Sequence, residues 1–235
     1  MTLNTEEILN NSFVVTIDGE RVAVFYKWFE EQGLRLPEKF IGYELTRDYL
    51  LKQFQFLRQL QKFNAPKVVE RNVRLFRAIS NNVSHWSIVQ LAKHANLPFV
   101  TIFEDDAKPV GNLRKRMDEL CSDIPDETDV LRLGYTKHIK RLTDYRRVNL
   151  SVPHSDNLII ENLSGSHAYI VFQRYYDRFI TENKIQPRCD FIKINPTLDK
   201  TVFALKESLF NQVNLPDRPV ISSWKLQDGS IKVNH

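Results

Sequence analysis

The sequence is poor in cysteine and glycine and has no long apolar run. Its two cysteines, Cys121 and Cys189, lie far apart and outside any CxxC pattern, which excludes a thiolate zinc site and argues against a disulfide scaffold. Only seven glycines and no GxxxxGK[ST] motif argue against a loop that cradles a nucleoside triphosphate. No apolar run reaches the ~18–20 residues of a membrane span, and residues 1–7 carry no features of a secretory signal.

The remaining composition is that of an ordinary globular protein. Apolar residues make up 42% and charged residues 26% of the 235, so we expect one domain over residues 1–235, located in the cytoplasm. The net charge of +4 and the pI near 9.0 suit an anionic ligand or an anionic membrane leaflet, which leaves peripheral contact with the inner membrane face open. Basic patches at 114–116 and 137–141 are too weak and dispersed for nucleic-acid binding, so we expect no nucleic-acid partner.

The most informative segment is residues 97–106. Its apolar part, Leu97 to Phe103, predicts a buried strand, and Glu104-Asp105-Asp106 follow at once. Three adjacent unpaired charges would each cost several kcal/mol, on the order of the effective desolvation penalty, if they were buried. We therefore expect them in a crevice at the carboxyl end of the strand, sharing a divalent cation that holds a phosphate-bearing substrate. The alternative is a solvated acidic turn with no function.

Alternating apolar patterns predict an α/β sandwich with a mostly parallel central sheet. We expect a turn at 18–21, a helical insertion around 44–80 and a loop-rich C-terminal segment at 195–235. The predicted strands span 13–17, 40–43, 99–103, 129–133, 157–160 and 168–172, and the predicted helices span 22–32, 46–63, 68–79, 82–96, 113–121 and 174–183.

Four segments, in order, resemble a known family of enzymes. They are residues 14–21 (VVTIDGER), 82–86 (NVSHW), 99–107 (FVTIFEDDA), and 165–171 (GSHAYIV) with Pro187-Arg188-Cys189-Asp190 after it; Phe40-Ile41-Gly42 adds a fifth match. Together they resemble the family 25 glycosyltransferases, of the lipooligosaccharide-biosynthesis and collagen-galactosyltransferase type. The resemblance covers residues 13 to 195, and the second and third segments are its most specific part.

The resemblance implies a GT-A-like, Rossmann-like fold and an inverting transfer of a sugar from a nucleotide-sugar donor. UDP-galactose is the donor that it implies, with Mn²⁺, or Mg²⁺ in its place, bridging the diphosphate. A glycan or glycolipid of bacterial surface-glycan (lipopolysaccharide) synthesis is the acceptor that it implies.

If the chain resembles these glycosyltransferases in function, we expect the acidic triplet to bind the metal and the donor. Alternation along extended chain places Glu104 and Asp106 on one face and Asp105 on the other. We predict Asp106 as the metal ligand and Glu104 as a contact to ribose or to metal-bound water, because hard carboxylate oxygens suit Mn²⁺ and Mg²⁺. Asp105 stays a second candidate ligand and a donor-binding residue.

An inverting transfer also needs a base within hydrogen-bond reach of the acceptor hydroxyl. Asp190 is the first candidate, and a helix cap or a surface carboxylate is its alternative role. Asp156 and Glu161 are weaker candidates. Arg21 is predicted to bind the diphosphate through its guanidinium, with a surface ion pair as the alternative.

The remaining candidates are donor-side and acceptor-side residues. His167 could offer an imidazole to the metal or the donor, or serve as a structural hydrogen-bond donor. Gly165 would allow close approach of the backbone to the sugar. Trp224 is the candidate for stacking on the acceptor. His85 is expected to be structural, with Ser84 at its helix N-terminus.

Two other functions remain open from the sequence. One is phosphoryl transfer or phosphatase activity that uses the same carboxylates. The other is a carbohydrate- or surface-binding module that retains the fold without turnover.

Overall fold

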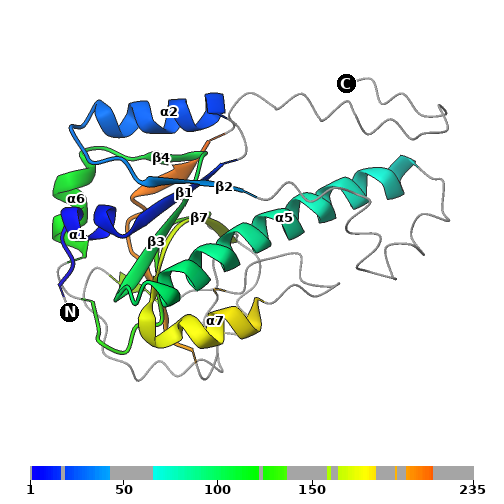
Figure 1. The fold of residues 1–235 in the computed structure, drawn as a ribbon. Coiled ribbons are helices and arrows are strands. Elements are labelled where there is room, and N and C mark those ends of the chain that lie inside the picture. The colour runs from blue at the N-terminus through cyan, green and yellow to red at the C-terminus, as the bar shows by residue number, and fades with distance from the viewer. Residues whose placement is uncertain are drawn as a thin grey trace.

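The computed structural model describes a mixed α/β fold (Figure 1), over residues 2–16, 19–42, 66–121, 124–136, 158–159, 164–183, 194 and 200–213. The helices are α1 (Thr5–Asn10), α2 (Gly19–Glu30), α5 (Pro66–His94), α6 (Leu113–Leu120), α7 (Tyr176–Glu182) and the 3₁₀ turn η2 (Gln173–Tyr175). The strands are β1 (Ser12–Thr16), β2 (Glu38–Ile41), β3 (Phe99–Glu104), β4 (Ala107–Pro109), β5 (Val130–Thr136), β6 (Leu158–Ile159), β7 (Ser164–Phe172), β8 (Val202–Leu205) and β9 (Phe210–Gln212).

All nine strands of the described residues belong to one mixed sheet, so the prediction of a mostly parallel sheet is wrong. The strand order is β2-β1-β3-β7-β5-β8-β6, and β4 and β9 pair with each other beside it. Strand β7 lies antiparallel between β3 and β5, and β6 is antiparallel to β8. Parallel pairing joins β1 to β2 and β3, and β5 to β8 and β9.

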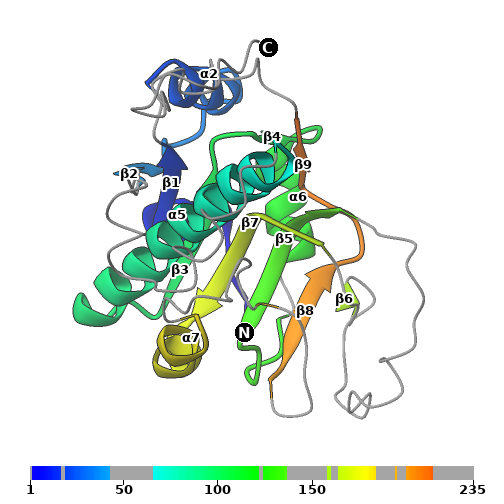
Figure 2. The ribbon, with the colours of Figure 1, turned by 90° about the vertical axis from the view of Figure 1, so that its right-hand side faces the viewer.

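Strands β3 and β5, on either side of the antiparallel strand β7, run in the same direction. Because β7 is antiparallel to both β3 and β5, the carboxyl ends of β1, β3 and β5 lie at one edge of the sheet, together with the first residues of β7 (Figure 2). Ligand sites of open α/β sheets lie at this edge.

Helices cover both faces of the sheet, and each face has its own apolar core (Figure 1). On one face Phe25 and Phe29 of α2 pack against Phe103 of β3, with ring centroids 5.8 Å apart in both pairs. On the other face Ile88 of α5 belongs to the core cluster that holds Tyr169 of β7. Adjacent strand residues point to opposite faces, which is why Ile102 and Phe103 belong to different cores.

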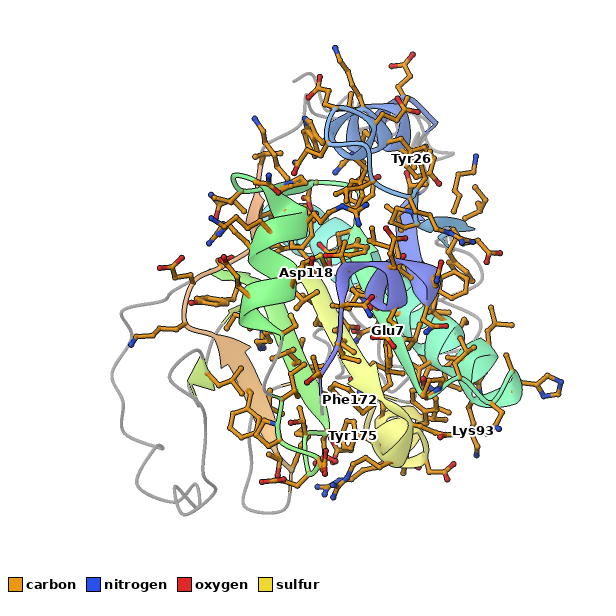
Figure 3. All side chains as sticks on the ribbon, turned by 90° about the vertical axis from the view of Figure 1, so that its left-hand side faces the viewer. Glu7, Tyr26, Lys93, Asp118, Phe172 and Tyr175 are labelled. Atoms are coloured by element: carbon orange, nitrogen blue, oxygen red, sulfur yellow. The ribbon has the colours of Figure 1, made fainter. Side chains whose placement is uncertain are left out.

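The short helices α1 and α6 are joined by the carboxylate of one residue of α6. Asp118 of α6 accepts hydrogen bonds at Oδ1 from the backbone N–H and the hydroxyl of Thr5, both at 2.8 Å, and Figure 3 shows Asp118 beside α1. Asn4 caps α1 in a reciprocal capping box with Glu7. These contacts fix the chain that leads into β1.

Helix α5 is one element where the sequence predicted two. The interruption predicted at 80–81 is absent, and Asn82 is buried within the helix. The helix ends at His94, where Asn96 adopts a left-handed conformation (φ 54°) and the Leu97 N–H donates to the Ala92 carbonyl. An Asn in this position is a common helix terminator, and it delivers the chain directly into β3.

Other predicted elements differ in extent. Helix α2 already begins at Gly19, inside the predicted turn, and residues 202–205 and 210–212 of the predicted loop-rich segment are strands β8 and β9. Residues 66–80 are helical as part of α5, whereas 43–65 and 214–235 lie outside the described residues. None of the described helices has the length and apolar character needed to cross a membrane.

Candidate functional site

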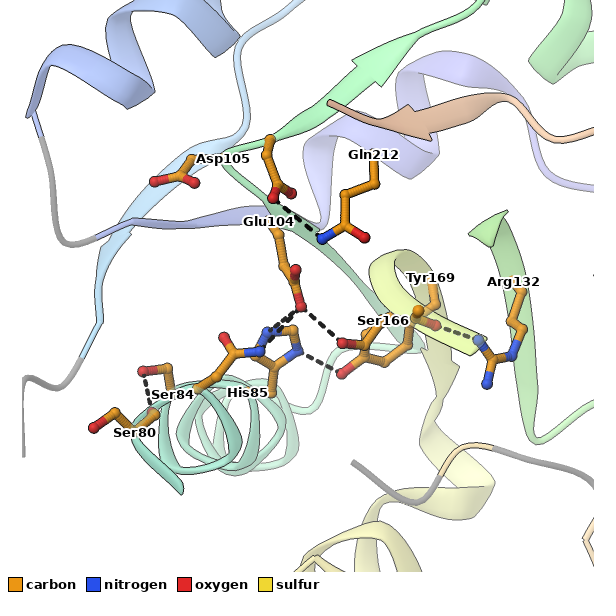
Figure 4. A network of polar contacts seen from close by, with 12 residues as sticks. Ser80, Ser84, His85, Glu104, Asp105, Arg132, Ser166, Tyr169 and Gln212 are labelled. Carbon is orange, nitrogen blue, oxygen red and sulfur yellow. Dashed lines mark hydrogen bonds and ion pairs between the residues drawn. The ribbon is translucent and has the colours of Figure 1, made fainter. Parts of the chain in front are cut away.

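The acidic triplet lies at the carboxyl edge of the sheet, where β3 ends. Glu104 is the last residue of β3, and Asp105 and Asp106 form the turn that leads into β4. The alternation predicted for extended chain therefore stops at Glu104, and the three carboxylates contact three different parts of the fold. Figure 4 shows the polar network around them.

Asp105 is buried and paired with cationic and polar groups of its own chain. Its Oδ2 accepts a hydrogen bond from the Thr16 hydroxyl (2.7 Å), and its Oδ1 lies 2.6 Å from Nη2 of Arg21. The Asp105 side chain is 7% exposed, so this is an ion pair largely shielded from water. It joins the first turn of α2 to the ends of β1 and β3, and it directs Arg21 toward the acidic turn.

Asp106 is partly buried, and its hydrogen bonding is incomplete among the described residues. Its Oδ2 accepts a hydrogen bond from Gln212 Nε2 (3.2 Å) and lies 3.7 Å from Arg21 Nη2. Its Oδ1 is buried and has no hydrogen-bond partner among the described residues. Burial, followed by repulsion from Glu104, raises the pKa of Asp106 above its usual value, while the Gln212 hydrogen bond, Arg21 and His167 oppose the rise. A buried carboxylate oxygen without a partner is costly, and a bound cation would satisfy it.

Glu104 is oriented by donors that all contact the same oxygen. Asn81 Nδ2 (3.0 Å) and Ser166 Oγ (2.7 Å) donate to Oε1, and His85 Nε2 lies 3.6 Å from Oε1 (Figure 4). Within the described part of the chain, no hydrogen bond reaches Oε2. The side chain is 17% exposed, so Oε2 is the oxygen left for a ligand.

His85 is fully buried, as the structural interpretation predicts. Burial lowers its pKa to about 3, so the ring is neutral, and its Nδ1 lies 2.7 Å from the Tyr169 hydroxyl. Ser84 is not at a helix N-terminus: it lies inside α5, and its hydroxyl donates to the Ser80 carbonyl (2.9 Å). The predicted cap is therefore wrong, because α5 starts well before the Ser-His pair.

Gly165 and His167 lie in β7 on either side of Ser166, which contacts Glu104. Gly165 has a φ of 88°, which disfavours any residue with a side chain, and its carbonyl accepts a hydrogen bond from Arg132 Nη1. His167 is completely buried, and its Nε2 donates to the Phe210 carbonyl (3.1 Å), because a carbonyl can only accept. Its Nδ1 has no hydrogen-bond partner among the residues described.

The closeness of His167 to the sheet depends on a glycine in the neighbouring strand. A Cβ at Gly134 would lie 2.6 Å from His167 Nε2 and 2.9 Å from the Phe210 Cβ. Only a residue without a side chain lets the imidazole lie over β5 at this point. His167 is therefore held in place by close packing against Gly134 and Phe210.

The donor set fits a cation that is shared with a substrate. No group of three His, Cys, Asp or Glu side chains that could hold a metal ion occurs within the described ranges. Asp106 supplies one unsatisfied carboxylate oxygen. Mg²⁺ is usually held in this way, through one or two carboxylates together with substrate phosphates and water.

Several predicted residues lie outside the described part of the chain. These are Asp190, its weaker alternatives Asp156 and Glu161, and Trp224. The polar residues around the triplet that were not among the predicted site residues are Thr16, Asn81, Arg132, Ser166, Tyr169 and Gln212. They come from five elements; Thr16, Ser166 and Tyr169 lie inside segments of the family resemblance, whereas Asn81, Arg132 and Gln212 lie outside all of them.

No protein-family model and no curated protein matches the sequence, and the chain has a distant likeness to a solved structure. Among solved structures the chain is similar to a glycosyltransferase involved in the glycosylation of the major capsid of PBCV-1. Identity is 8%, the match covers 88% of this chain and 93% of that chain, and the TM-score is 0.41, which is too low to carry an argument about fold or function.

Proposed function

We propose that this chain is a metal-dependent glycosyltransferase, which moves a sugar from a nucleotide-sugar donor to a glycan or glycolipid acceptor. The observation that carries the proposal is the Asp106 carboxylate at the carboxyl edge of the sheet, a side chain that is 17% exposed and whose buried Oδ1 is unsatisfied among the described residues. A solvated acidic turn would have neither the burial nor the paired Asp105 beside it.

The three carboxylates take different roles in this proposal. Asp106 is the cation ligand, and the cation supplies positive charge to the diphosphate that leaves. Asp105 holds Arg21 near the same phosphates through the 2.6 Å ion pair. Glu104 offers Oε2 to a hydroxyl of the donor or to metal-bound water, since Oε1 is already occupied.

The finer parts of the proposal rest on the resemblance to family 25. They are UDP-galactose as the donor, Mn²⁺ in preference to Mg²⁺, inversion at the anomeric carbon and a surface-glycan acceptor, with contact at the inner membrane face open. Asp190 is proposed as the base and Trp224 as the acceptor-stacking residue. Gly165 and His167 are proposed to form the donor-facing wall.

A thermal-shift panel of nucleotide sugars tests the proposal. We expect one or more UDP-sugars to raise the unfolding temperature with Mn²⁺ present, and we expect EDTA to remove the effect, because ligand binding to the folded state stabilises it. The matched control is the corresponding nucleoside monophosphate, which lacks the diphosphate linkage and the transferred sugar. A flat panel with every donor and both metals would contradict the proposal.

Product analysis separates the other two functions. Release of phosphate from simple monoesters would favour a phosphatase. Binding of a nucleotide sugar without transfer to any acceptor glycan would favour a binding module.

A further inference from the structure

The polar side chains around Glu104 all approach the same carboxylate oxygen, Oε1. Asn81 comes from α5 and Ser166 from β7, and both donate to Oε1. His85, one turn along α5 from Asn81, brings Nε2 to 3.6 Å from the same oxygen. Catalytic hydrogen bonds are often this long before a ligand is bound.

The tautomer of His85 follows from its partner. The Tyr169 hydroxyl is fully buried, and its one hydrogen-bond contact among the described residues is His85 Nδ1 at 2.7 Å. If Tyr169 donates to Nδ1, the single proton of the neutral ring lies on Nε2 and faces Glu104. The opposite tautomer would leave the Tyr169 proton without an acceptor and direct the Nε2 lone pair at a carboxylate.

The orientation of His85 indicates more than a packing role, because its Nε2 is directed at the acidic triplet. His85 Nε2 is fully buried, has no hydrogen-bond partner within the described residues and lies next to Glu104. The rings of His85 and Tyr169 stack nearly parallel, with an interplanar angle of 10° and centroids 5.7 Å apart. Tyr169 therefore fixes the plane of the imidazole as well as the ring nitrogen that carries the proton.

We infer that His85 is a positioning residue, held by Tyr169 as the Nε2–H tautomer, which keeps Glu104 turned so that Oε2 receives a ribose hydroxyl of the bound nucleotide sugar. The inference rests on the proposed function. His85 does not contact the ligand itself: it acts through Glu104, as outer-shell partners orient the groups that bind.

The test compares two buried tyrosines. Tyr169→Phe removes the hydroxyl that sets the tautomer, and Tyr176→Phe is the matched control, because Tyr176 is equally buried and its hydroxyl has no partner among the described residues. Calorimetry with Mn²⁺ uses two probes, UDP, which carries ribose hydroxyls, and pyrophosphate, which has none. We expect Tyr169→Phe to weaken UDP about 10-fold, the lower end for loss of an outer-shell partner, and to leave pyrophosphate unchanged.

Two further measurements exclude a merely structural effect. Imidazole ¹⁵N spectra should show His85 as the Nε2–H tautomer in the wild type and in Tyr176→Phe, and as a mixture in Tyr169→Phe. His85→Gln, which keeps an acceptor and an N–H donor, should retain most of the UDP affinity that His85→Leu loses.

The outcomes separate this inference from the function on which it rests. If Tyr169→Phe binds UDP as tightly as Tyr176→Phe does, or weakens UDP and pyrophosphate equally, the positioning role is overturned and the proposed function stands. If the wild type binds neither probe, both are overturned.

Discussion

At the scale of single residues, the acidic triplet divides into one paired and two available carboxylates. Asp105 is paired with Arg21 and Thr16, whereas Asp106 Oδ1 has no partner among the described residues and Glu104 presents Oε2. Asp106 is therefore where stability and the proposed function conflict, as is common for residues that bind ligands.

Asp106→Asn should stabilise the ligand-free protein by about 1 kcal/mol at pH 7, the usual scale for relieving such a conflict. For a chain of this size that equals a rise in Tm of about 2–4 °C. The reason is that burial raises the Asp106 pKa, so the charged form is disfavoured in the folded state. Chemical denaturation of the two proteins measures the difference.

The pH dependence of that difference follows from the sign of the shift. A carboxylate with a raised folded-state pKa destabilises the protein above that pKa, and the penalty fades as pH falls toward the unfolded value of 3.8. The gain from Asp106→Asn should therefore shrink between neutral pH and pH about 3. Asp177→Asn, at a side chain that is 83% exposed, is the control. A gain that grows on acidification would contradict the assignment.

Arg21→Met should destabilise the protein by about 3 kcal/mol, because it leaves the buried Asp105 carboxylate without its ion-pair partner. Adding Asp105→Asn should restore part of the loss, since the uncompensated charge is then gone. The double-mutant cycle, followed by urea unfolding, measures this coupling.

Lys27→Met is the control for Arg21→Met. It removes a cation that is 73% exposed and should change the free energy of unfolding by less than about 0.5 kcal/mol. Strict additivity of the Arg21 and Asp105 substitutions would show that the pair contributes nothing as a pair.

At the scale of elements, the junction of β5, β7 and β9 is closely packed and carries a residue that contacts the acidic triplet. Gly134 pairs with Ala168 of β7 and with Phe210 of β9, and His167 lies over it. Gln212 of β9 then reaches Asp106. The position of the unsatisfied carboxylate therefore depends on a close approach of backbone that only glycine allows.

Gly134→Ala should cost about 1–3 kcal/mol, the range for overpacking a well-filled core, since the new methyl group would overlap the His167 ring and the Phe210 Cβ. Gly19→Ala, where nothing lies within 4 Å of the added Cβ, is the matched control. Thermal unfolding of the two variants gives the comparison, and equal Tm values would disprove the close packing.

The elements also show what a sequence pattern can and cannot reveal. The apolar run of β3 and its acidic end were predictable, because both signals are local. The continuity of α5 was not, because separate helices were predicted over 68–79 and 82–96. In the structure Asn81, which lies in the predicted gap, contacts Glu104, and Asn82 is buried inside the helix. Tertiary contacts outweighed the low helix propensity of asparagine.

At the scale of the whole molecule, the sequence predicted an α/β sheet with the triplet at its carboxyl edge but not the direction of β7. An apolar run such as 168–172 packs equally well in either direction, so periodicity carries no information about strand polarity. Gln212 and Ser166 could not be predicted as neighbours of the triplet for a similar reason: they are 106 and 62 residues distant from their partners in the chain.

The most direct test of the account is calorimetric titration of UDP into the wild type and Asp106→Asn, each with Mn²⁺ and with EDTA. The account predicts that Mn²⁺ strengthens UDP binding at least 10-fold in the wild type, the lower bound set by loss of a metal-site group, and has no effect in Asp106→Asn. Equal UDP affinity in all four titrations would contradict the assignment of Asp106 as a cation ligand.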